Sequence, residues 1–339
     1  MVTLSILIPT YNRAQKLLRL LQEIYSQIIA ENLGDQIKVL ISDNASKDTT
    51  KEICIQYLVD KPNFQYFRQS SNLGPNLNFL FLFEQAKTHY IWFICDDDIP
   101  LPGAIAKVLS GLENYKPDVL LFSFIQPPGS KHRAFNFTNY YEIVRDPEQI
   151  IKLVWNPKAS TYVMRRIELT PDIRRELEPH YESGYLFVDI TYSVLGTSNN
   201  PTLCIISEAL ATCDEDYVKF EFTPGILTNT YKIFYHPFVL KHFPSLPEQF
   251  KDQSYCVEIQ FLFAVKMGSL IVENIRIYDE AIEQMEYKLI PLLKNPRSFI
   301  QLFFMKNNLT NLYKKIKPAV ALYRHLRGSI LQKKTACYL

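Results

Sequence analysis

The sequence predicts an α/β fold: a doubly wound, mostly parallel sheet with a mainly helical C-terminal extension. Two observations predict it. Over the first 125 residues, short apolar runs alternate with segments whose apolar residues recur at helical spacing, and polar clusters follow three of the runs. Strands that alternate with helices in this way usually form a parallel sheet covered by helices on both faces.

The first two strand–helix pairs are the clearest. An apolar run at 4–8 ends at Pro9 and predicts a buried strand. Apolar residues then recur at helical spacing over 17–28, which predicts a helix. A second run rich in β-formers, 37–41, precedes a polar turn, and we expect another helix from Asp48, which would cap it.

The following segments continue the alternation up to residue 125. The turn at Gly74-Pro75 separates a weak strand from a very apolar helix. The expected elements are strands at 64–67, 90–94 and 119–125, a helix at 77–86, and a helix that begins near Pro102.

Beyond Pro127 the pattern is weaker. We expect a loop at 126–140, helices at 146–154 and 184–195, a strand at 161–164, and mostly helix over 245–339.

Composition excludes several classes of protein. The 339 residues are 47% hydrophobic and 21% charged and include only 10 Gly, which excludes a mainly disordered or collagen-like chain. The six cysteines form no C-x-x-C pair, so we expect reduced thiols in a cytosolic protein. No apolar run reaches the ~18–20 residues of a membrane span, and the N-terminus does not resemble a signal peptide. We therefore expect a cytoplasmic protein.

Three adjacent carboxylates, Asp96-Asp97-Asp98, follow the expected strand at 90–94. Neighbouring acids repel one another, so this arrangement is costly without a cation or hydrogen-bond donors. Carboxylate oxygens suit Mg²⁺ or Mn²⁺. The alternative is a solvated acidic turn before the helix near Pro102. In parallel sheets ligands bind beyond the carboxyl ends of the strands, and this position favours a functional site.

Two weaker polar clusters follow the first two strands. After the first, Tyr11 can stack on a planar base, Thr10 can hydrogen-bond to it, and Arg13 can approach a phosphate. The alternative is a helix start capped by Thr10 or Asn12. After the second strand, Asp43 can accept a hydrogen bond from a base or can form an Asx turn.

Four segments together resemble, in order and spacing, the family 2 glycosyltransferases, and are most like the abequosyltransferase-type enzymes of O-antigen and polysaccharide assembly. The resemblance covers about residues 3–125 and becomes loose from 126 to about 220. The segments are Ser5-Ile6-Leu7-Ile8-Pro9-Thr10-Tyr11-Asn12-Arg13, Ser42-Asp43-Asn44-Ala45-Ser46-Lys47-Asp48, Asn72-Leu73-Gly74-Pro75-Asn76 and Cys95-Asp96-Asp97-Asp98.

The resemblance implies an A-type glycosyltransferase fold, a nucleotide-diphosphate sugar donor and a cofactor, Mn²⁺ or Mg²⁺. Asp98 and Asp96 would bind the metal. The commonest family pattern is Asp-x-Asp-Asp, and this chain has Cys95 at the first acidic position, so Asp97 and Asp98 match the motif better than Asp96 does. The donor contacts that the resemblance implies are Pro9, Thr10, Tyr11, Arg13, Asp43, Asn72, Asp96 and Asp97.

The resemblance also implies a single displacement that inverts the anomeric carbon. The metal would stabilise the leaving diphosphate, and a carboxylate base would deprotonate the acceptor hydroxyl. We expect Asp189 to be this base, because the family often places its base in this region and a carboxylate inside an apolar helix often serves function. Glu182 and the acids at 214–216 are the alternatives.

The predicted organisation follows from these assignments. Residues 1–125 would bind the donor, 126–225 would bind the acceptor within the same catalytic domain, and 226–339 would form a mostly helical region with a basic tail. Residues 287–339 hold 11 Lys and Arg and no Asp or Glu, whereas the rest of the chain holds 26 basic and 35 acidic residues.

The basic tail predicts a cationic amphipathic helix, because basic and apolar residues interleave over 306–334. Such a helix can lie on an anionic membrane, which would suit a lipid-linked saccharide acceptor and a peripheral position on the inner face of the cell membrane. The alternative is a helix packed on the acidic body. Nucleic acid is not expected as a partner, because no binding motif accompanies the charge.

Two other functions would use the same acids. A different phosphoryl enzyme, such as a nucleotidyltransferase or a phosphatase, is disfavoured because the chain has no G-x-x-x-x-G-K-[ST] loop. An inactive sugar-nucleotide binding module is disfavoured because Asp43, Asp97 and Asp98 are all present.

Overall fold

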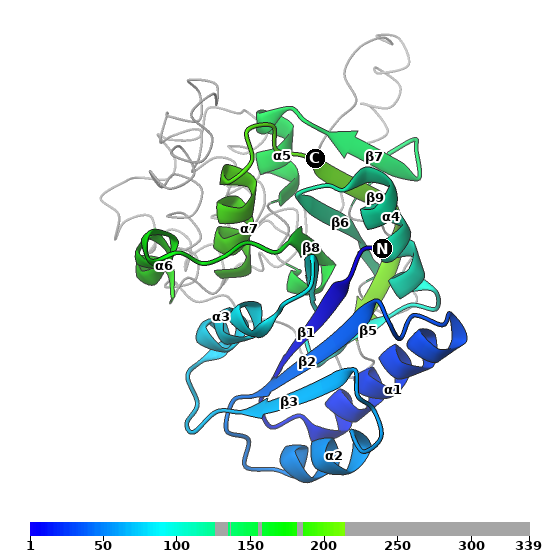
Figure 1. The fold of residues 1–339 in the computed structure, drawn as a ribbon, viewed down its shortest axis with the longest axis vertical. Helices are drawn as coiled ribbons and strands as arrows, with labels where there is room; N and C mark the ends of the chain where they lie inside the picture. The colour runs from blue at the N-terminus through cyan, green and yellow to red at the C-terminus, as the bar shows by residue number, and fades with distance from the viewer. Residues whose placement is uncertain (126–134, 136, 155–157, 182–185, 214–339) are drawn as a thin grey trace, which may run out of the picture. The chain divides into compact units, whose positions relative to one another are not determined.

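The fold is taken from a computed structural model that describes residues 1–213, apart from 126–134, 136, 155–157 and 182–185 (Figure 1). Strands and helices alternate through the first half, as the sequence predicts. The strands are β1 Leu4–Thr10, β2 Ile37–Asp43, β3 Phe64–Arg68, β4 Tyr90–Phe93, β5 Asp98–Pro100, β6 Val119–Ile125, β7 Tyr141–Val144, β8 Tyr162–Arg165 and β9 Leu203–Cys213. The helices are α1 Ala14–Ala30, α2 Thr50–Tyr57, α3 Pro75–Gln85, α4 Ala104–Tyr115, α5 Pro147–Val154, α6 Pro171–Leu177 and α7 Leu186–Gly196, with 3-10 turns η1 Ala159–Thr161 and η2 Glu178–His180.

The strands form one sheet in the order β3-β2-β1-β4-β8-β6-β9-β5, with β7 paired to β9. The first four strands of this order run parallel, and β1 lies between β2 and β4. This confirms the α/β class. The sheet as a whole is mixed, because β8 pairs antiparallel with both β4 and β6, and β5 and β7 pair antiparallel with β9.

The second half of the described chain completes the sheet that the first half begins. The expected strand at 161–164 is β8, and it separates β4 from β6. The expected helices at 146–154 and 184–195 correspond to α5 and α7. The strands β5, β7 and β9 were not predicted. The three residues of β5 are too few to show a period. The strand β9 is paired on both sides, and such a strand shows no alternation of apolar and polar residues.

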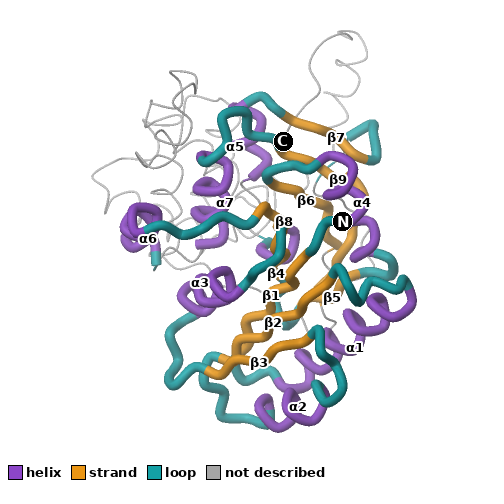
Figure 2. Tube along the Cα trace, in the orientation of Figure 1, coloured by secondary structure: helices purple, strands orange, loops and turns teal. Residues whose placement is uncertain are grey.

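The helices cover both faces of the sheet (Figures 1 and 2). On one face, apolar residues of α1 and α4 pack in a single core with Ile6, Val39 and Trp92 from β1, β2 and β4. On the other face, Phe79 of α3 packs edge-on against Phe93 of β4, and it also contacts Phe187 of α7. The carboxyl ends of β1, β2 and β4 lie at one edge of the sheet, which is where ligands bind in folds of this kind.

Other expectations fall on residues that are not described, namely most of the loop at 126–140, the acidic cluster at 214–216, the helical region at 245–339 and the basic segment at 306–334. Among the described residues, no helix has the length and apolar character needed to cross a bilayer.

The buried amide of Gln27 ties α1 to the chain that follows the three acids. Its Nε2 donates to the carbonyl of Leu101 at 3.0 Å, and its Oε1 accepts from the backbone N–H of Ile105 at 3.2 Å. Gln27 is 5% exposed, so these backbone groups have little access to water as a substitute partner. One side chain therefore fixes the path from β5 into α4.

We predict that Gln27→Leu lowers the free energy of unfolding by about 2–4 kcal/mol, because a buried group left unpaired costs roughly 1–3 kcal/mol. Urea unfolding followed by circular dichroism would measure the change. The exposed Gln22 on the same helix is the control, and Gln22→Leu should shift stability by no more than about 0.5 kcal/mol. Equal effects of the two substitutions would contradict the role assigned to Gln27.

Candidate functional site

The loops that follow β1 and β4 are joined through their side chains. The hydroxyl of Thr10 donates to Asp96 Oδ2 at 2.7 Å, and the Arg13 guanidinium donates to Asp96 Oδ1 at 2.8 Å. The same Arg13 nitrogen lies 2.9 Å from a carboxylate oxygen of Asp97. Charge-assisted bonds of this kind offset the repulsion between adjacent acids. The expectation that these two clusters meet is confirmed.

The loop after β2 joins the same assembly. The backbone N–H of Asn12 donates to Ser46 Oγ at 2.8 Å, and that of Lys47 donates to Asn12 Oδ1 at 2.7 Å. Asn12 has a positive φ of 54°, a conformation that Asn tolerates better than most residues. Asn72 is linked in turn, since its Oδ1 accepts from Asn44 Nδ2 at 2.8 Å. Four segments separated in sequence therefore converge at the carboxyl edge of the parallel strands.

At this edge the capping alternative for Thr10 and Asn12 is wrong, whereas the expectation that Asp48 caps the second helix is confirmed. The helix α1 begins after Arg13 with no side-chain cap from Thr10 or Asn12. Asp48 serves both helices instead: its Oδ2 accepts from the N–H of Ala14, at the start of α1, and its Oδ1 accepts from the N–H of Thr50, at the start of α2. These bonds lower the pKa of Asp48, although burial opposes them.

Burial raises the pKa values of two of the three acids. Asp96 is 4% exposed, and desolvation raises its pKa to about 6 against the opposing effects of Arg13 and Thr10. Asp98 is 5% exposed, and desolvation raises its pKa to about 7, with Lys158 opposing. A buried carboxylate is costly as an anion unless a cation or donors accompany it. The acidic turn is therefore largely buried, unlike the solvated turn considered as the alternative.

The second half of the chain contributes two residues to this acidic edge that sequence reasoning missed. The hydroxyl of Ser160, on η1, donates to Asp98 Oδ2 at 2.5 Å and accepts from the N–H of Cys95 at 2.9 Å. Lys158, just before η1, is close enough to lower the pKa of Asp98, and its Nζ lies 4.8 Å from the centre of the Phe124 ring. No sequence motif marks either residue, because the pairing of β8 beside β4 is what brings this segment to the site.

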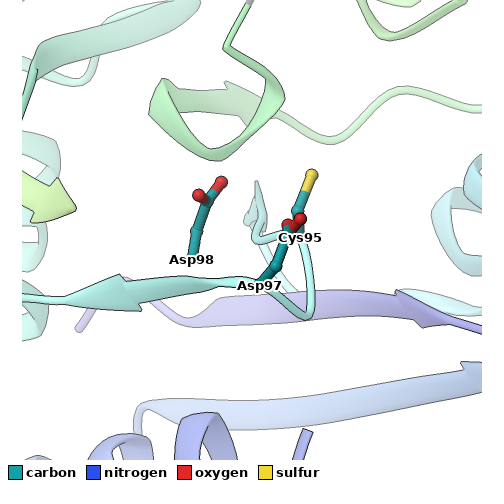
Figure 3. A group of neighbouring side chains, drawn as sticks. All are labelled: Cys95, Asp97 and Asp98. Carbon is teal, nitrogen blue, oxygen red and sulfur yellow. The ribbon is translucent and has the colours of Figure 1, made fainter. Parts of the chain in front are cut away.

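Cys95, Asp97 and Asp98 form a group suited to a metal ion, and we call it the Cys95–Asp97–Asp98 cluster. One ligand atom from each residue lies within 4.8 Å of the others. Figure 3 shows the Asp98 carboxylate and the Cys95 sulfur pointing to the same side of the chain. Oxygen and sulfur donors at this spacing fit a divalent cation.

The expected metal ligand Asp96 lies outside this cluster, and Asp97 takes its place in the group, so the role of Asp96 at a metal stays a prediction. Asp98 remains in the cluster, but both oxygens of Asp96 are engaged by Thr10 and Arg13. Asp97 is about one-third exposed at its side chain and can turn toward a ligand. Burial and the neighbouring acids raise the pKa of the Cys95 thiol well above its ordinary range.

Asp43 is held by hydrogen bonds within its own part of the site, and the local one comes from the third residue on rather than the second, as an Asx turn would require. It is completely buried, and its Oδ1 accepts from the N–H of Ser46 at 2.7 Å. Its Oδ2 accepts from the Tyr66 hydroxyl at 2.7 Å and from the Arg68 guanidinium at 2.6 Å. Asp43 has no exposed surface through which a base could reach it in this structure, so its contact with a base stays a prediction.

The remaining donor residues differ in their access. Tyr11 is 38% exposed at the convergence of the loops and is available for stacking. Pro9 is half-buried in β1 opposite Ser42, and Asn72 is exposed. Thr10 is 3% exposed and its hydroxyl is bonded to Asp96, so it holds that carboxylate in position.

Asp189 lies in the interior of the protein. It is completely buried on α7, and its Oδ1 is 3.3 Å from Nδ1 of His180, which is 4% exposed. The rival Glu182 and the acids at 214–216 lie outside the described residues. The assignment of the catalytic base is therefore still a prediction.

We predict that the metal-free protein loses stability as the pH rises from 3.8 toward 7 through Asp98. The pKa of Asp98 is about 7 in the folded protein and 3.8 in the unfolded chain. Between these pH values the folded state keeps the proton and the unfolded state releases it, so a rise in pH favours unfolding. Melting temperatures with a chelator present should therefore fall for wild type relative to Asp98→Asn as the pH rises. The exposed Asp35, just before β2, supplies the control, Asp35→Asn. Parallel curves for wild type and Asp98→Asn would contradict the prediction.

Comparison with known proteins identifies the first half of the chain. The family model described as Glycosyl transferase family 2 matches residues 5–166. Abequosyltransferase RfbV of Salmonella typhimurium is 38% identical over 113 residues, which are 33% of this chain and 33% of that protein. GalNAc(5)-diNAcBac-PP-undecaprenol beta-1,3-glucosyltransferase of Campylobacter jejuni is 27% identical over 137 residues, 40% of this chain and 43% of that protein. The chain thus spans about a third to two fifths of the length of these relatives.

A solved structure shares the fold over most of the chain. TarS 1-349 of S. aureus, in complex with UDP-GlcNAc, superposes with a TM-score of 0.63 and 16% identity, covering 94% of this chain and 92% of that one. The resemblance found in the sequence is thus confirmed: residues 5–166, just under half of the chain, match the model of the family 2 glycosyltransferases.

Proposed function

We propose that this protein is an inverting glycosyltransferase that moves a sugar from a nucleotide-diphosphate donor to a hydroxyl of a saccharide acceptor. One observation carries the proposal: the loops after β1, β2 and β4 converge, so that the exposed Tyr11 lies at the same edge as the Cys95–Asp97–Asp98 cluster. A planar base and a diphosphate need these two features side by side. The family match of residues 5–166 supports the same reaction class.

The donor would be held at both of its ends. Tyr11 would stack on the base, which every nucleoside offers as a flat face. Arg13 is about half exposed at its side chain and carries a full charge, so it can turn from Asp97 toward a phosphate. Its bond to the buried Asp96 would keep the guanidinium in place meanwhile.

The leaving diphosphate would meet positive charge at the other end of the site. A divalent cation bound by the Cys95–Asp97–Asp98 cluster would stabilise the negative charge that develops on the departing diphosphate. Lys158 approaches from the opposite half of the chain and would add a second positive charge near Asp98. Ser160 holds the Asp98 carboxylate in position by its hydrogen bond.

The base would come from the second half of the chain, and Asp189 is our assignment. A general base must reach the acceptor hydroxyl directly or through one water. Its pairing with His180 would orient the carboxylate. Both residues are buried, so this role requires Asp189 on α7 to become accessible when the acceptor binds.

The acceptor would be a saccharide in cell-surface polysaccharide or O-antigen assembly, carried on a lipid. The Campylobacter relative is named for a saccharide linked to undecaprenol, which supports this class. The basic segment 306–334 would then place the enzyme on the anionic inner face of the cell membrane. This segment lies outside the described residues, and its membrane role rests on sequence.

We predict that one nucleoside diphosphate among UDP, GDP, CDP and TDP binds wild type in a Mn²⁺-dependent manner, measured by titration calorimetry. Asp98→Asn should weaken that binding by at least ~10-fold, because loss of ligand support at metal sites costs on the order of 10–100-fold in affinity. Asp35→Asn should leave it unchanged. Failure of all four nucleotides, with and without Mn²⁺, would exclude the proposed donor site.

We predict that Asp189→Asn abolishes sugar transfer and leaves nucleotide binding within about twofold of wild type. Loss of a hydrogen-bonded charge inside the protein also costs on the order of 1–3 kcal/mol, so thermal unfolding is measured alongside turnover. Ser193→Ala, one turn further along α7, is the control for disturbing the helix. Near-normal turnover in a destabilised Asp189→Asn would make Asp189 a structural residue and remove it from the reaction.

A further inference from the structure

We infer that the sulfur of Cys95 is itself a ligand of the divalent cation, together with Asp97 and Asp98, and that the site therefore prefers thiophilic ions such as Zn²⁺ or Co²⁺ to Mg²⁺. The inference rests on the proposed function, because it concerns the cation of the donor site. It differs from the expectation from sequence, which assigned the metal to carboxylates alone.

The geometry brings the three donor atoms together without help from an ion. Cys95 Sγ and one oxygen each from Asp97 and Asp98 lie within 4.8 Å of one another. In Figure 3 the sulfur and the Asp98 carboxylate extend from the chain toward the same space. Asp96, the acid in between, is directed to Thr10 and Arg13 instead. The chain therefore gathers sulfur and two carboxylates, and leaves the third carboxylate out.

A second set of contacts holds these positions. Ser160 Oγ links two of the ligand residues, since it accepts from the Cys95 N–H and donates to Asp98. Asp98 is also fixed by the pairing of β5 with β9, in which it lies opposite Cys213. A carboxylate can accept several hydrogen bonds, and Asp98 is 5% exposed with one hydroxyl donor at 2.5 Å. A buried carboxylate so placed has capacity left for a cation.

Donor chemistry then decides which ions the site holds. Mg²⁺ requires near-octahedral oxygen ligands and keeps its waters, whereas Zn²⁺ accepts sulfur and carboxylate oxygen together. Thiolates select the softer ions among the divalent metals. Three protein ligands leave at least one position open, which diphosphate oxygens of the donor can take.

The binding step is an exchange of a proton for a metal ion. The S–H bond of Cys95 breaks, its proton passes to solvent, and the electron pair left on sulfur forms the bond to the cation. No oxidation state changes, and no reductant or oxidant is required.

The test uses Co²⁺ with the reduced, metal-stripped full chain. A thiolate ligand gives a sulfur-to-cobalt charge-transfer absorption in the near ultraviolet, which oxygen ligands do not give. Wild type should show this band at one Co²⁺ per chain, and Cys95→Ser should lose it. Cys213→Ser is the matched control, because Cys213 lies opposite Asp98 in the sheet but outside the cluster, and it should keep the band. A band that survives in Cys95→Ser would overturn the inference.

Competition measures the preference directly. In wild type, stoichiometric Zn²⁺ should displace Co²⁺, whereas a hundredfold excess of Mg²⁺ should not. Cys95→Asp supplies an oxygen in place of sulfur, and we expect it to shift the preference toward Mg²⁺ by at least tenfold, measured by calorimetric titration of each ion. An unchanged ratio of affinities in Cys95→Asp would also overturn the inference.

These outcomes are separable from failure of the proposed function. Metal-dependent nucleotide binding without a sulfur-to-cobalt band would keep the transferase and reject Cys95 as a ligand. A band that depends on Cys95, in a chain that binds no nucleotide, would keep the thiolate site and reject the transferase.

Discussion

The contact between Arg13 and the acids after β4 is the interaction on which the site depends. Asp96, Asp97 and Asp98 are adjacent in sequence, and two of them are buried, so their charges would repel one another strongly. Arg13 binds Asp96 and Asp97 together, and Thr10 donates to Asp96 as well. This one contact lets two of the three acids lie side by side at the mouth of the sheet, and it also joins β1 to β4 at the edge where a donor would bind.

The remaining acid is balanced from the other half of the chain. Ser160 donates to Asp98, and Lys158 lowers the pKa that burial raises. Both residues arrive because β8 pairs antiparallel beside β4. The predicted donor half and acceptor half therefore share one site, because Asp98 of the first half is held partly by Ser160 and Lys158 of the second. A substitution of Ser160 or Lys158 should therefore alter the pKa and the position of Asp98, although no sequence motif marks the segment around η1.

Two carboxylates that the sequence predicts to act in the site, Asp43 as a contact to the base and Asp189 as the catalytic base, are completely buried. Asp43 accepts hydrogen bonds from Ser46, Tyr66 and Arg68, and it holds the loop after β2 in shape. Asp189 is enclosed with His180. A sequence shows that a carboxylate follows a strand or lies in an apolar helix, but burial depends on which distant segments cover it. The sequence therefore could not predict whether these two carboxylates are accessible to a ligand.

The sequence by itself determined the α/β class, the helices α1 to α4, the parallel strands β1 to β4 and the edge at which the polar clusters meet, because hydrophobic period and turn residues are local properties of the chain. The four motifs in register also identified the family. Only the tertiary structure decided that β8 lies between β4 and β6, that Ser160 and Lys158 reach the acids, and that Cys95 rather than Asp96 stands with Asp97 and Asp98. These are contacts between residues far apart in sequence, and no local pattern encodes which distant partner a side chain will meet.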